Sequence, residues 1–302
     1  MKKKIVIAGG TGFLGTCLIK EFKKTDTKII VLTRSKSRDY NGVSYIHWDA
    51  CNQGDWCKHI NGAEVIINMV GRSVNCRYTE KNKAEIINSR VNATKALGIA
   101  ISKCSIAPEL WINAGSAAIF GNSGDEFKNE ESEVGHGFSP EVCKRWEQAF
   151  NEVKTPHTRK IFLRIGMVFQ PGNGVLKPFT NLARLGLGGT IGDGNQYITW
   201  IHYKDFTNMI FWLIERGSIV GIVHCASPNP VPNKEFMQYL RKAVGMPIGL
   251  PNPSGLIKIG AVLIGTEAEL ILTGRRVISK VLKENKFTFT FPILQEALED
   301  LI

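Results

Sequence analysis

Three glycines at positions 9, 12 and 15 are the residues whose type and spacing most clearly indicate chemistry. They follow an apolar run at residues 5–8, which is typical of a strand buried on both faces of a parallel sheet. Apolar residues then recur at helical spacing from Leu14 onward. A strand, a glycine turn and a helix form a pyrophosphate site, because glycine permits close approach and the helix N-terminus offers free N–H groups. The sequence therefore predicts dinucleotide contacts from Gly9, Thr11, Gly12, Phe13, Leu14 and Gly15.

The end of the next expected strand, at residues 28–32, indicates which dinucleotide binds. A site that prefers NAD usually has an acidic residue there, which holds the ribose 2′-hydroxyl. Here the strand leads into Arg34 and Ser35, and no acidic residue comes before Asp39. An arginine can bind a 2′-phosphate through charge-assisted hydrogen bonds, so we expect Arg34 and Ser35 to contact NADP(H), with NAD(H) as the less favoured cofactor. A solvated basic loop is the alternative interpretation.

Strand and helix signals alternate through the first two-thirds of the chain. Further strands are expected at residues 44–47, 64–68, 110–113 and 160–164, and the longest helical pattern covers residues 80–103. This alternation predicts an α/β fold with a parallel, doubly wound sheet. Ligands of such sheets bind outside the carboxyl ends of the strands, so the residues that follow each strand are candidates for the site.

Small or polar residues stand at these expected strand ends. Asp49 follows the third strand, where its carboxylate is expected to accept a hydrogen bond from an adenine amino group. Val70 and Gly71 follow the fourth strand, where backbone can pass close to a ribose, and Ala114 follows the fifth. Tight packing of strand against helix is the alternative explanation for each position.

The pattern loosens after about residue 170, where glycines become frequent. A strand-like run at residues 197–202 leads into a helix, and three prolines between positions 247 and 253 mark a joint. Residues 287–292 alternate phenylalanine with polar residues, as a half-buried strand does. We therefore expect a smaller C-terminal α+β region beyond the main sheet.

Composition limits the class of protein. The chain has 302 residues, 43% of them hydrophobic and 22% charged, with a net charge of +11 that suits anionic ligands as well as simple solubility. No basic stripe interleaved with aromatics indicates nucleic-acid binding. The basic residues 2–4 precede an apolar run too short for a signal peptide, and no stretch is long enough to span a membrane. Seven scattered cysteines without a C-x-x-C pair indicate reduced thiols in a cytoplasmic protein and no metal site.

Several phrases along the chain carry a resemblance. They are the glycine turn, Val31-Leu32-Thr33-Arg34-Ser35, Val65-Ile66-Ile67-Asn68, Arg164-Ile165-Gly166-Met167-Val168, Trp200-Ile201-His202-Tyr203-Lys204-Asp205 and Gly274-Arg275-Arg276-Val277. With these phrases the chain resembles an extended short-chain dehydrogenase/reductase of the NAD-dependent epimerase/dehydratase type. It is most similar to a subgroup described as sugar-nucleotide epimerases, which has a small C-terminal domain of unknown function. The resemblance implies a Rossmann-type NAD(P)-binding domain over residues 1–170, a mixed region over 171–250, partly Rossmann and partly substrate-binding, and a small C-terminal domain over 251–302.

In the wider family a tyrosine acts as acid and base, a lysine four residues later lowers its pKa, and a serine or threonine holds the reacting oxygen. The serine carries over to Ser116, but the tyrosine and lysine positions hold Ser139 and Cys143, with Lys144 one residue out of register. A serine cannot replace the tyrosine, because its hydroxyl does not ionise near neutral pH. Arg90 stands where the family's central-helix asparagine is expected, and we assign it to the cofactor site.

Two functions are compatible with the absence of the family's tyrosine and lysine. The first is an NAD(P)-dependent oxidoreductase or epimerase that acts on a sugar-nucleotide-like or other anionic small-molecule substrate, with Ser116 polarising the reacting oxygen. His202 is the candidate acid/base because of its ordinary pKa, and a structural histidine is the alternative. Cys143 has two interpretations, either a nucleophile or a buried, unreactive thiol. The second function is a cofactor sensor or scaffold without catalysis. Dimerisation through helices that flank the sheet is common in the wider family, so the resemblance leaves a homodimer open as the assembly.

Overall fold

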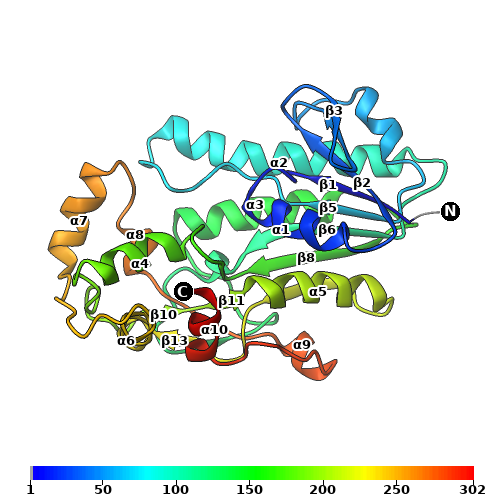
Figure 1. Ribbon diagram of the computed structural model, residues 1–302. Coiled ribbons are helices and arrows are strands. Elements are labelled where there is room, and N and C mark those ends of the chain that lie inside the picture. Colours follow the sequence, from blue (N-terminus) through cyan, green and yellow to red (C-terminus); the bar gives the residue numbers. More distant parts are fainter. Residues whose placement is uncertain (1–2) are drawn as a thin grey trace.

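The computed structural model describes residues 3–302, so Lys2 at the basic start lies outside the described part. Its main element is an eight-stranded sheet in the order β12-β8-β6-β5-β1-β2-β4-β3, parallel throughout except for the edge strand β3 (Figure 1). The bounds are β1 Lys3–Ala8, β2 Thr27–Thr33, β3 Arg38–Tyr40, β4 Val43–His47, β5 Val65–Asn68, β6 Leu110–Ser116, β8 Arg159–Ile165 and β12 Gly221–Cys225. The strand order reverses between β1 and β5, and such a switch point opens a crevice for ligands at the carboxyl ends of the strands.

Helices cover both faces of this sheet. Helix α2, Glu80–Ser102, packs against α3, Phe138–Glu152, while α1, Phe13–Phe22, packs against α5, Tyr203–Glu215 (Figure 1). Their apolar sides form one core with the central strands, which are buried almost along their whole length. The expected doubly wound parallel sheet is therefore confirmed, and the fold is Rossmann-like.

A second core lies beyond the carboxyl ends of the strands and is built around Trp200 and Phe236. Three helices enclose it, α4 Leu176–Arg184, α6 Asn233–Ala243 and α10 Leu294–Leu301. Short strand pairs join it to the sheet region, namely β9 Met167–Phe169 with β11 Trp200–His202 and β10 Tyr197–Ile198 with β13 Val231–Pro232. The remaining elements are η1 Asp55–His59, η2 Ala117–Phe120, β7 Phe127–Lys128, α7 Ser254–Leu263, α8 Glu269–Leu272, β14 Arg276–Val277 and α9 Lys280–Glu284.

Strand β14 brings the C-terminal part of the chain back to the sheet. It runs parallel to β7, and Val277 is fully buried in a small cluster with Ala117, Phe120 and Cys143. This return places residues 274–277 beside the carboxyl end of β6 and the first turns of α3.

Two local predictions need correction. Residues 287–292 do not form a strand, because the backbone N–H groups of Thr290 and Phe291 donate to the buried Asp205 carboxylate (2.7 and 2.8 Å) in place of a neighbouring strand. The run at residues 197–202 is two strands that pair with different partners, and Thr199 separates them.

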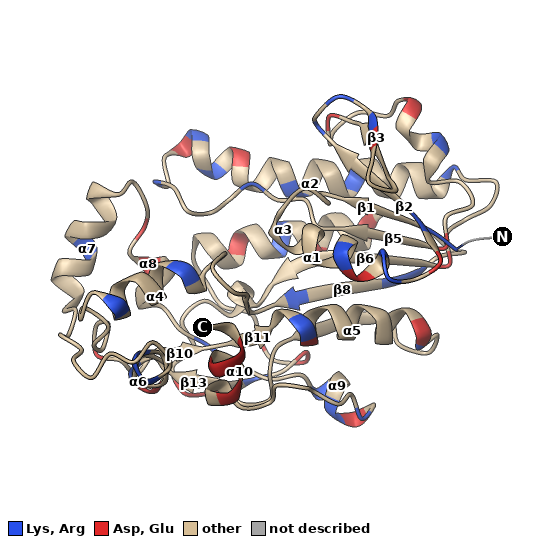
Figure 2. Ribbon diagram, in the orientation of Figure 1, with Lys and Arg blue, Asp and Glu red and all other residues tan. Residues whose placement is uncertain are grey.

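Charged side chains of both signs are spread over the molecule. Figure 2 shows lysines and arginines on all parts of it, with acidic residues among them. Within residues 3–302, no helix is long and apolar enough to cross a membrane.

Candidate functional site

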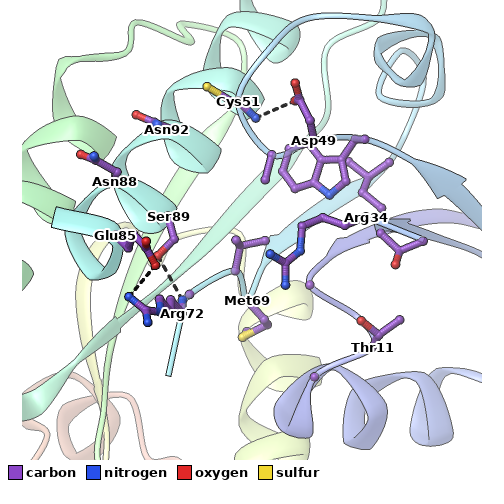
Figure 3. Close-up of a pocket in the computed structure, with 18 of the residues that line it drawn as sticks. Thr11, Arg34, Asp49, Cys51, Met69, Arg72, Glu85, Asn88, Ser89 and Asn92 are labelled. Carbon is purple, nitrogen blue, oxygen red and sulfur yellow. Dashed lines mark hydrogen bonds and ion pairs between the residues drawn. The ribbon is translucent and has the colours of Figure 1, made fainter. Parts of the chain in front are cut away.

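The main cavity lies at the carboxyl ends of β1, β2 and β5, beside α2, and has a volume of about 650 Å³ (Figure 3). The structure brings together seven of the residues expected at a cofactor site, and these line the cavity: Gly9, Thr11, Gly12, Arg34, Asp49, Val70 and Gly71. The other candidates lie outside the lining. They are Phe13, Leu14, Gly15, Ser35, Arg90, Ala114, Ser116 and His202.

The glycine turn is shaped by close backbone approaches. Gly9 has a φ of +76°, and a Cβ there would lie 2.9 Å from the Met69 backbone, so a side chain is excluded. Gly12 precedes α1 in extended conformation, and no side chain caps the helix. The N–H groups of the first turn therefore have no side-chain cap, and Gly12, which directly precedes them, lines the cavity. A Cβ on Gly15 would lie 2.4 Å from Gly10 Cα, which explains this glycine by helix packing alone.

Arg34 follows β2 directly, and its side chain is exposed. Figure 3 shows the guanidinium group projecting into the cavity, with Asp49 on one side and Thr11 on the other. Among residues 3–302 the guanidinium has no hydrogen-bond or ion-pair partner, so all its donors are available to a ligand. Ser35 lies next to it with its backbone N–H 3.3 Å from Thr33 Oγ1, which fixes the turn after the strand.

Asp49 shapes the loop on the opposite side of the cavity. Its carboxylate accepts hydrogen bonds from the backbone N–H groups of Asn52 and Cys51 (both 2.8 Å) and from Asn52 Nδ2 (2.7 Å). These bonds, with those from Asn52 largest, lower the pKa of Asp49, because they stabilise the charged form. The carboxylate is therefore ionised at neutral pH and oriented by its own loop.

One wall of the cavity was not foreseen from the sequence. Arg72 follows β5, forms an ion pair with Glu85 (2.7 Å) and donates its backbone N–H to Ser89 Oγ (3.0 Å) (Figure 3). Glu85, Ser89 and Asn92 project from α2 toward the cavity. Their spacing of four and three residues places them on one helix face, and this periodicity is the signal that would have identified them.

Arg90 lies just beneath this wall. Its Cζ is 5.1 Å from the centre of the Trp146 ring, and Nη1 donates to the Ile86 carbonyl (2.9 Å). The guanidinium also adjoins the cavity rim, because a Cβ on Gly71 would lie 3.2 Å from Arg90 Cζ.

The expected catalytic residues are held by structural contacts. Ser116 ends β6, and its hydroxyl accepts a hydrogen bond from Ala118 N (3.1 Å) as the cap of η2. Cys143 is buried in α3, and burial, followed by the nearby Glu147, raises the pKa of its thiol to about 12. At neutral pH the thiol is therefore protonated, and the thiolate needed for nucleophilic chemistry is absent.

His202 lies in the second part of the molecule, away from the cavity lining. It is fully buried, its Nδ1 accepts from Lys204 N (3.2 Å) at the start of α5, and its Nε2 is 3.2 Å from Asp300 Oδ2. The ring lies against Phe291 at a centroid distance of 4.0 Å. Burial lowers the pKa of His202 to about 4, although Asp300 opposes this shift. The structure thus does not bring His202 together with Ser116.

Metal chemistry has no ligand set in the part of the chain that the structure describes. No group of three or more His, Cys, Asp or Glu side chains in residues 3–302 is arranged to hold an ion. All seven cysteines are free thiols.

Comparison with known proteins gives the family. Residues 5–225 match the model described as the NAD dependent epimerase/dehydratase family. The chain belongs to this family. Residues 253–301 of this epimerase-family protein also match a domain of unknown function, DUF1731.

Relatives cover almost the whole chain. "Epimerase family protein YfhF" from Bacillus subtilis is 30% identical over 99% of this chain and 97% of its own length. The chloroplastic "Epimerase family protein SDR39U1 homolog" from Arabidopsis thaliana is 28% identical over 99% of this chain and 86% of its own. The crystal structure of human epimerase family protein SDR39U1 with NADPH superposes with a TM-score of 0.88 at 26% identity, and the match covers 99% of this chain and 98% of that one. This chain is therefore similar to a protein whose structure contains NADPH.

Proposed function

We propose that this epimerase-family protein binds NADP(H) and catalyses hydride transfer to or from an anionic carbonyl or alcohol substrate, as an oxidoreductase or epimerase. The observation that carries the proposal is the Arg34 guanidinium, which has no partner among residues 3–302 and shares one cavity with the glycine turn. The turn suits a pyrophosphate, and a free guanidinium at the end of β2 suits a 2′-phosphate. The NADPH in the structure of the human relative agrees with this choice.

The residues present fit such a cofactor. Gly9 and Gly12 would face the pyrophosphate, Arg34 and the adjacent Ser35 the 2′-phosphate, Asp49 the adenine and Gly71 a ribose. When bound, the cofactor supplies or accepts the hydride. The protein's part is to hold it against the open strand ends, with residues 171–302 proposed to close the substrate pocket above them.

A second candidate function is an NADP(H) sensor or scaffold. It is favoured by the residues at the expected tyrosine and lysine positions. Ser139 donates to Glu269 Oε1 (3.1 Å), and Cys143 is a buried, protonated thiol. Neither residue supplies the acid and the cation that the wider family uses.

Mass spectrometry of the nicotinamide released on denaturation separates these functions. The purified protein is denatured, and the redox state and amount of released cofactor are measured. Stoichiometric, tightly retained NADP supports an epimerase-like cycle that regenerates the cofactor in place. A site that fills reversibly with NADPH calls for a screen of carbonyl substrates, in which turnover supports a reductase and its absence supports a sensor. If neither NADP(H) nor NAD(H) is retained or bound, the proposal is wrong.

A further inference from the structure

Arg90 carries a positive charge that the described residues do not neutralise. Its guanidinium lies between the Trp146 ring and Gly71, and its one hydrogen bond within residues 3–302 goes to the Ile86 carbonyl. Burial lowers the pKa of Arg90, which reflects the cost of holding a charge without a counterion. Its remaining donors are unpaired beside the rim of the cavity.

Arg275 approaches the same place from the C-terminal part of the chain. Side chains two residues apart in extended backbone share a face, and Val277 on that face is buried against Cys143. Arg276 takes the opposite face, over the Phe127 ring. The Arg275 guanidinium donates to Thr273 Oγ1 (3.3 Å) and forms no ion pair within the described residues, while burial lowers its pKa.

The two arginines lie around the same stretch of α3. Arg90 lies over the Trp146 ring, one turn after Cys143, and Val277, two residues after Arg275, is buried in one cluster with Cys143. Both arginines, together with Arg164, lower the pKa of the Cys143 thiol, against the larger effects of burial and Glu147. The carboxylate of Glu147 does not compensate them, because it is committed to a bidentate pair with Arg164 (2.8 and 3.0 Å). The Glu269 carboxylate opposes the lowering of the Arg275 pKa, and this single carboxylate does not balance two guanidinium charges.

An unpaired hydroxyl donor borders the same cluster. Tyr78 Oη is buried without a hydrogen-bond partner in the described residues, and the Tyr78 charge state influences Arg90. The Ser139 hydroxyl, which donates to Glu269, lies close enough to lower the Tyr78 pKa, against the larger effect of burial. Burial raises the pKa of Tyr78 to about 12, so the phenol stays protonated and remains a donor at neutral pH.

We propose that Arg90 and Arg275 bind an oxyanion group of the substrate, a carboxylate or a phosphate, beside Cys143, with the Tyr78 hydroxyl as a third donor. Both guanidinium groups are half-buried without a counterion among the described residues, and an oxyanion held by guanidinium forks would supply that charge with directed hydrogen bonds. The inference rests on the proposed function, since the cluster adjoins the cofactor cavity through Gly71. It assigns the substrate an anionic group and gives Arg90 a substrate contact.

Calorimetric titration of the NADPH-saturated protein tests this site. Saturation with NADPH occupies Arg34, so that this arginine does not compete for the added anion. Inorganic phosphate and malonate are titrated separately, and their relative affinities show which oxyanion the site prefers. We expect binding of at least one anion by the wild type, at least a tenfold loss in Arg90→Gln and in Arg275→Gln, and a smaller loss in Tyr78→Phe. The NADPH dissociation constant should stay within about threefold in all of them, since a tenfold change would signal a lost ionic contact.

Two controls keep the outcome clear. Arg216→Gln removes another arginine that lies over a tryptophan ring, Trp212 at 5.6 Å, and should leave anion affinity unchanged. Thermal unfolding of each variant shows whether it is folded, and Arg90→Lys and Arg275→Lys, which keep the charge but lose the fork, replace any variant that is not. Anion affinity equal to wild type in either arginine variant, or a wild type that binds neither anion, overturns the proposal. A loss of NADPH affinity alone in Arg90→Gln likewise overturns it and would assign Arg90 to the cofactor.

Failure of the proposed function has a different signature. If the wild type does not bind NADPH, the same titrations are carried out on cofactor-free protein in an Arg34→Ala background. Loss of anion binding on removal of Arg90 or Arg275 then still supports the oxyanion site, and unchanged binding refutes it.

Discussion

Replacing Arg34 by alanine separates a phosphate site from an ordinary basic loop. The side chain is exposed at the end of β2 and has no partner within residues 3–302, so its removal breaks no internal contact. The free energy of unfolding should therefore change by less than about 0.5 kcal/mol, as for other surface substitutions. Any larger effect must appear in ligand binding.

The size of that effect follows from the contact. Hydrogen bonds to charged groups contribute about 1.5–3 kcal/mol. Because Arg34 is solvent-exposed, screening places it at the lower end, at about 1.5–2 kcal/mol. Each 1.4 kcal/mol is a factor of ten, so the NADPH dissociation constant should rise roughly 10- to 30-fold in Arg34→Ala. NADH lacks the 2′-phosphate, and its dissociation constant should change by less than about threefold.

Fluorescence titration of both reduced cofactors at two ionic strengths measures these changes. Lys36→Ala is the matched control, because Lys36 is also exposed and basic but does not line the cavity. It should weaken NADPH binding only slightly, and the weakening should disappear at the higher ionic strength. Equal losses for NADPH and NADH in Arg34→Ala would refute the 2′-phosphate assignment, and so would a Lys36→Ala variant that loses as much NADPH affinity as Arg34→Ala.

Further variants test other parts of the account. Gly12→Val should abolish binding of both cofactors by titration while the protein stays folded, because Gly12 has an ordinary backbone conformation and a Cβ there approaches only one carbonyl oxygen, at 3.3 Å. His202→Gln should leave NADPH affinity and any turnover within a few-fold of wild type, and lost turnover with intact binding would instead make His202 the acid/base. Burial lowers the pKa of His202 from 6.5 to about 4, so between these pH values the unfolded chain binds a proton that the folded chain does not. Urea denaturation should therefore show that His202 reduces the free energy of unfolding by up to about 1.4 kcal/mol per pH unit as the pH falls from 6.5 to about 4. This pH dependence should be absent in His202→Gln. Glu147→Gln, which leaves Arg164 buried without its carboxylate, should cost about 3–5 kcal/mol of unfolding free energy, against less than about 1 kcal/mol for the exposed Glu141→Gln.

Local patterns were enough to predict the sheet and seven of the residues that line the main cavity. The central strands appear in the sequence as short apolar runs because both of their faces are buried, and β1 and β5 are examples. The glycine turn follows β1 within a few residues, so its strand, turn and helix are contiguous in the chain. That Arg34 lines the cavity could likewise be predicted, because it directly follows β2.

The environments that depend on contacts between distant parts of the chain were harder to predict. The alternation of phenylalanine at 287–292 indicated a strand, but the Asp205 carboxylate takes the backbone donors of Thr290 and Phe291. His202 has the right chemistry for an acid, but burial against Phe291 and its contact with Asp300 give it a structural environment.

The sequence by itself determined the family, the doubly wound sheet and the position of the glycine turn, because short apolar runs, glycine spacing and motif phrases are local patterns along the chain. Only the tertiary structure decided which charges lack partners. Arg164 is buried and Arg275 is half-buried. Arg164 pairs with the Glu147 carboxylate, whereas Arg275 forms no ion pair within the described residues. A counterion can come from any part of a folded chain, so the pairing of a charge is a property of the packed molecule and cannot be deduced from spacing along the sequence.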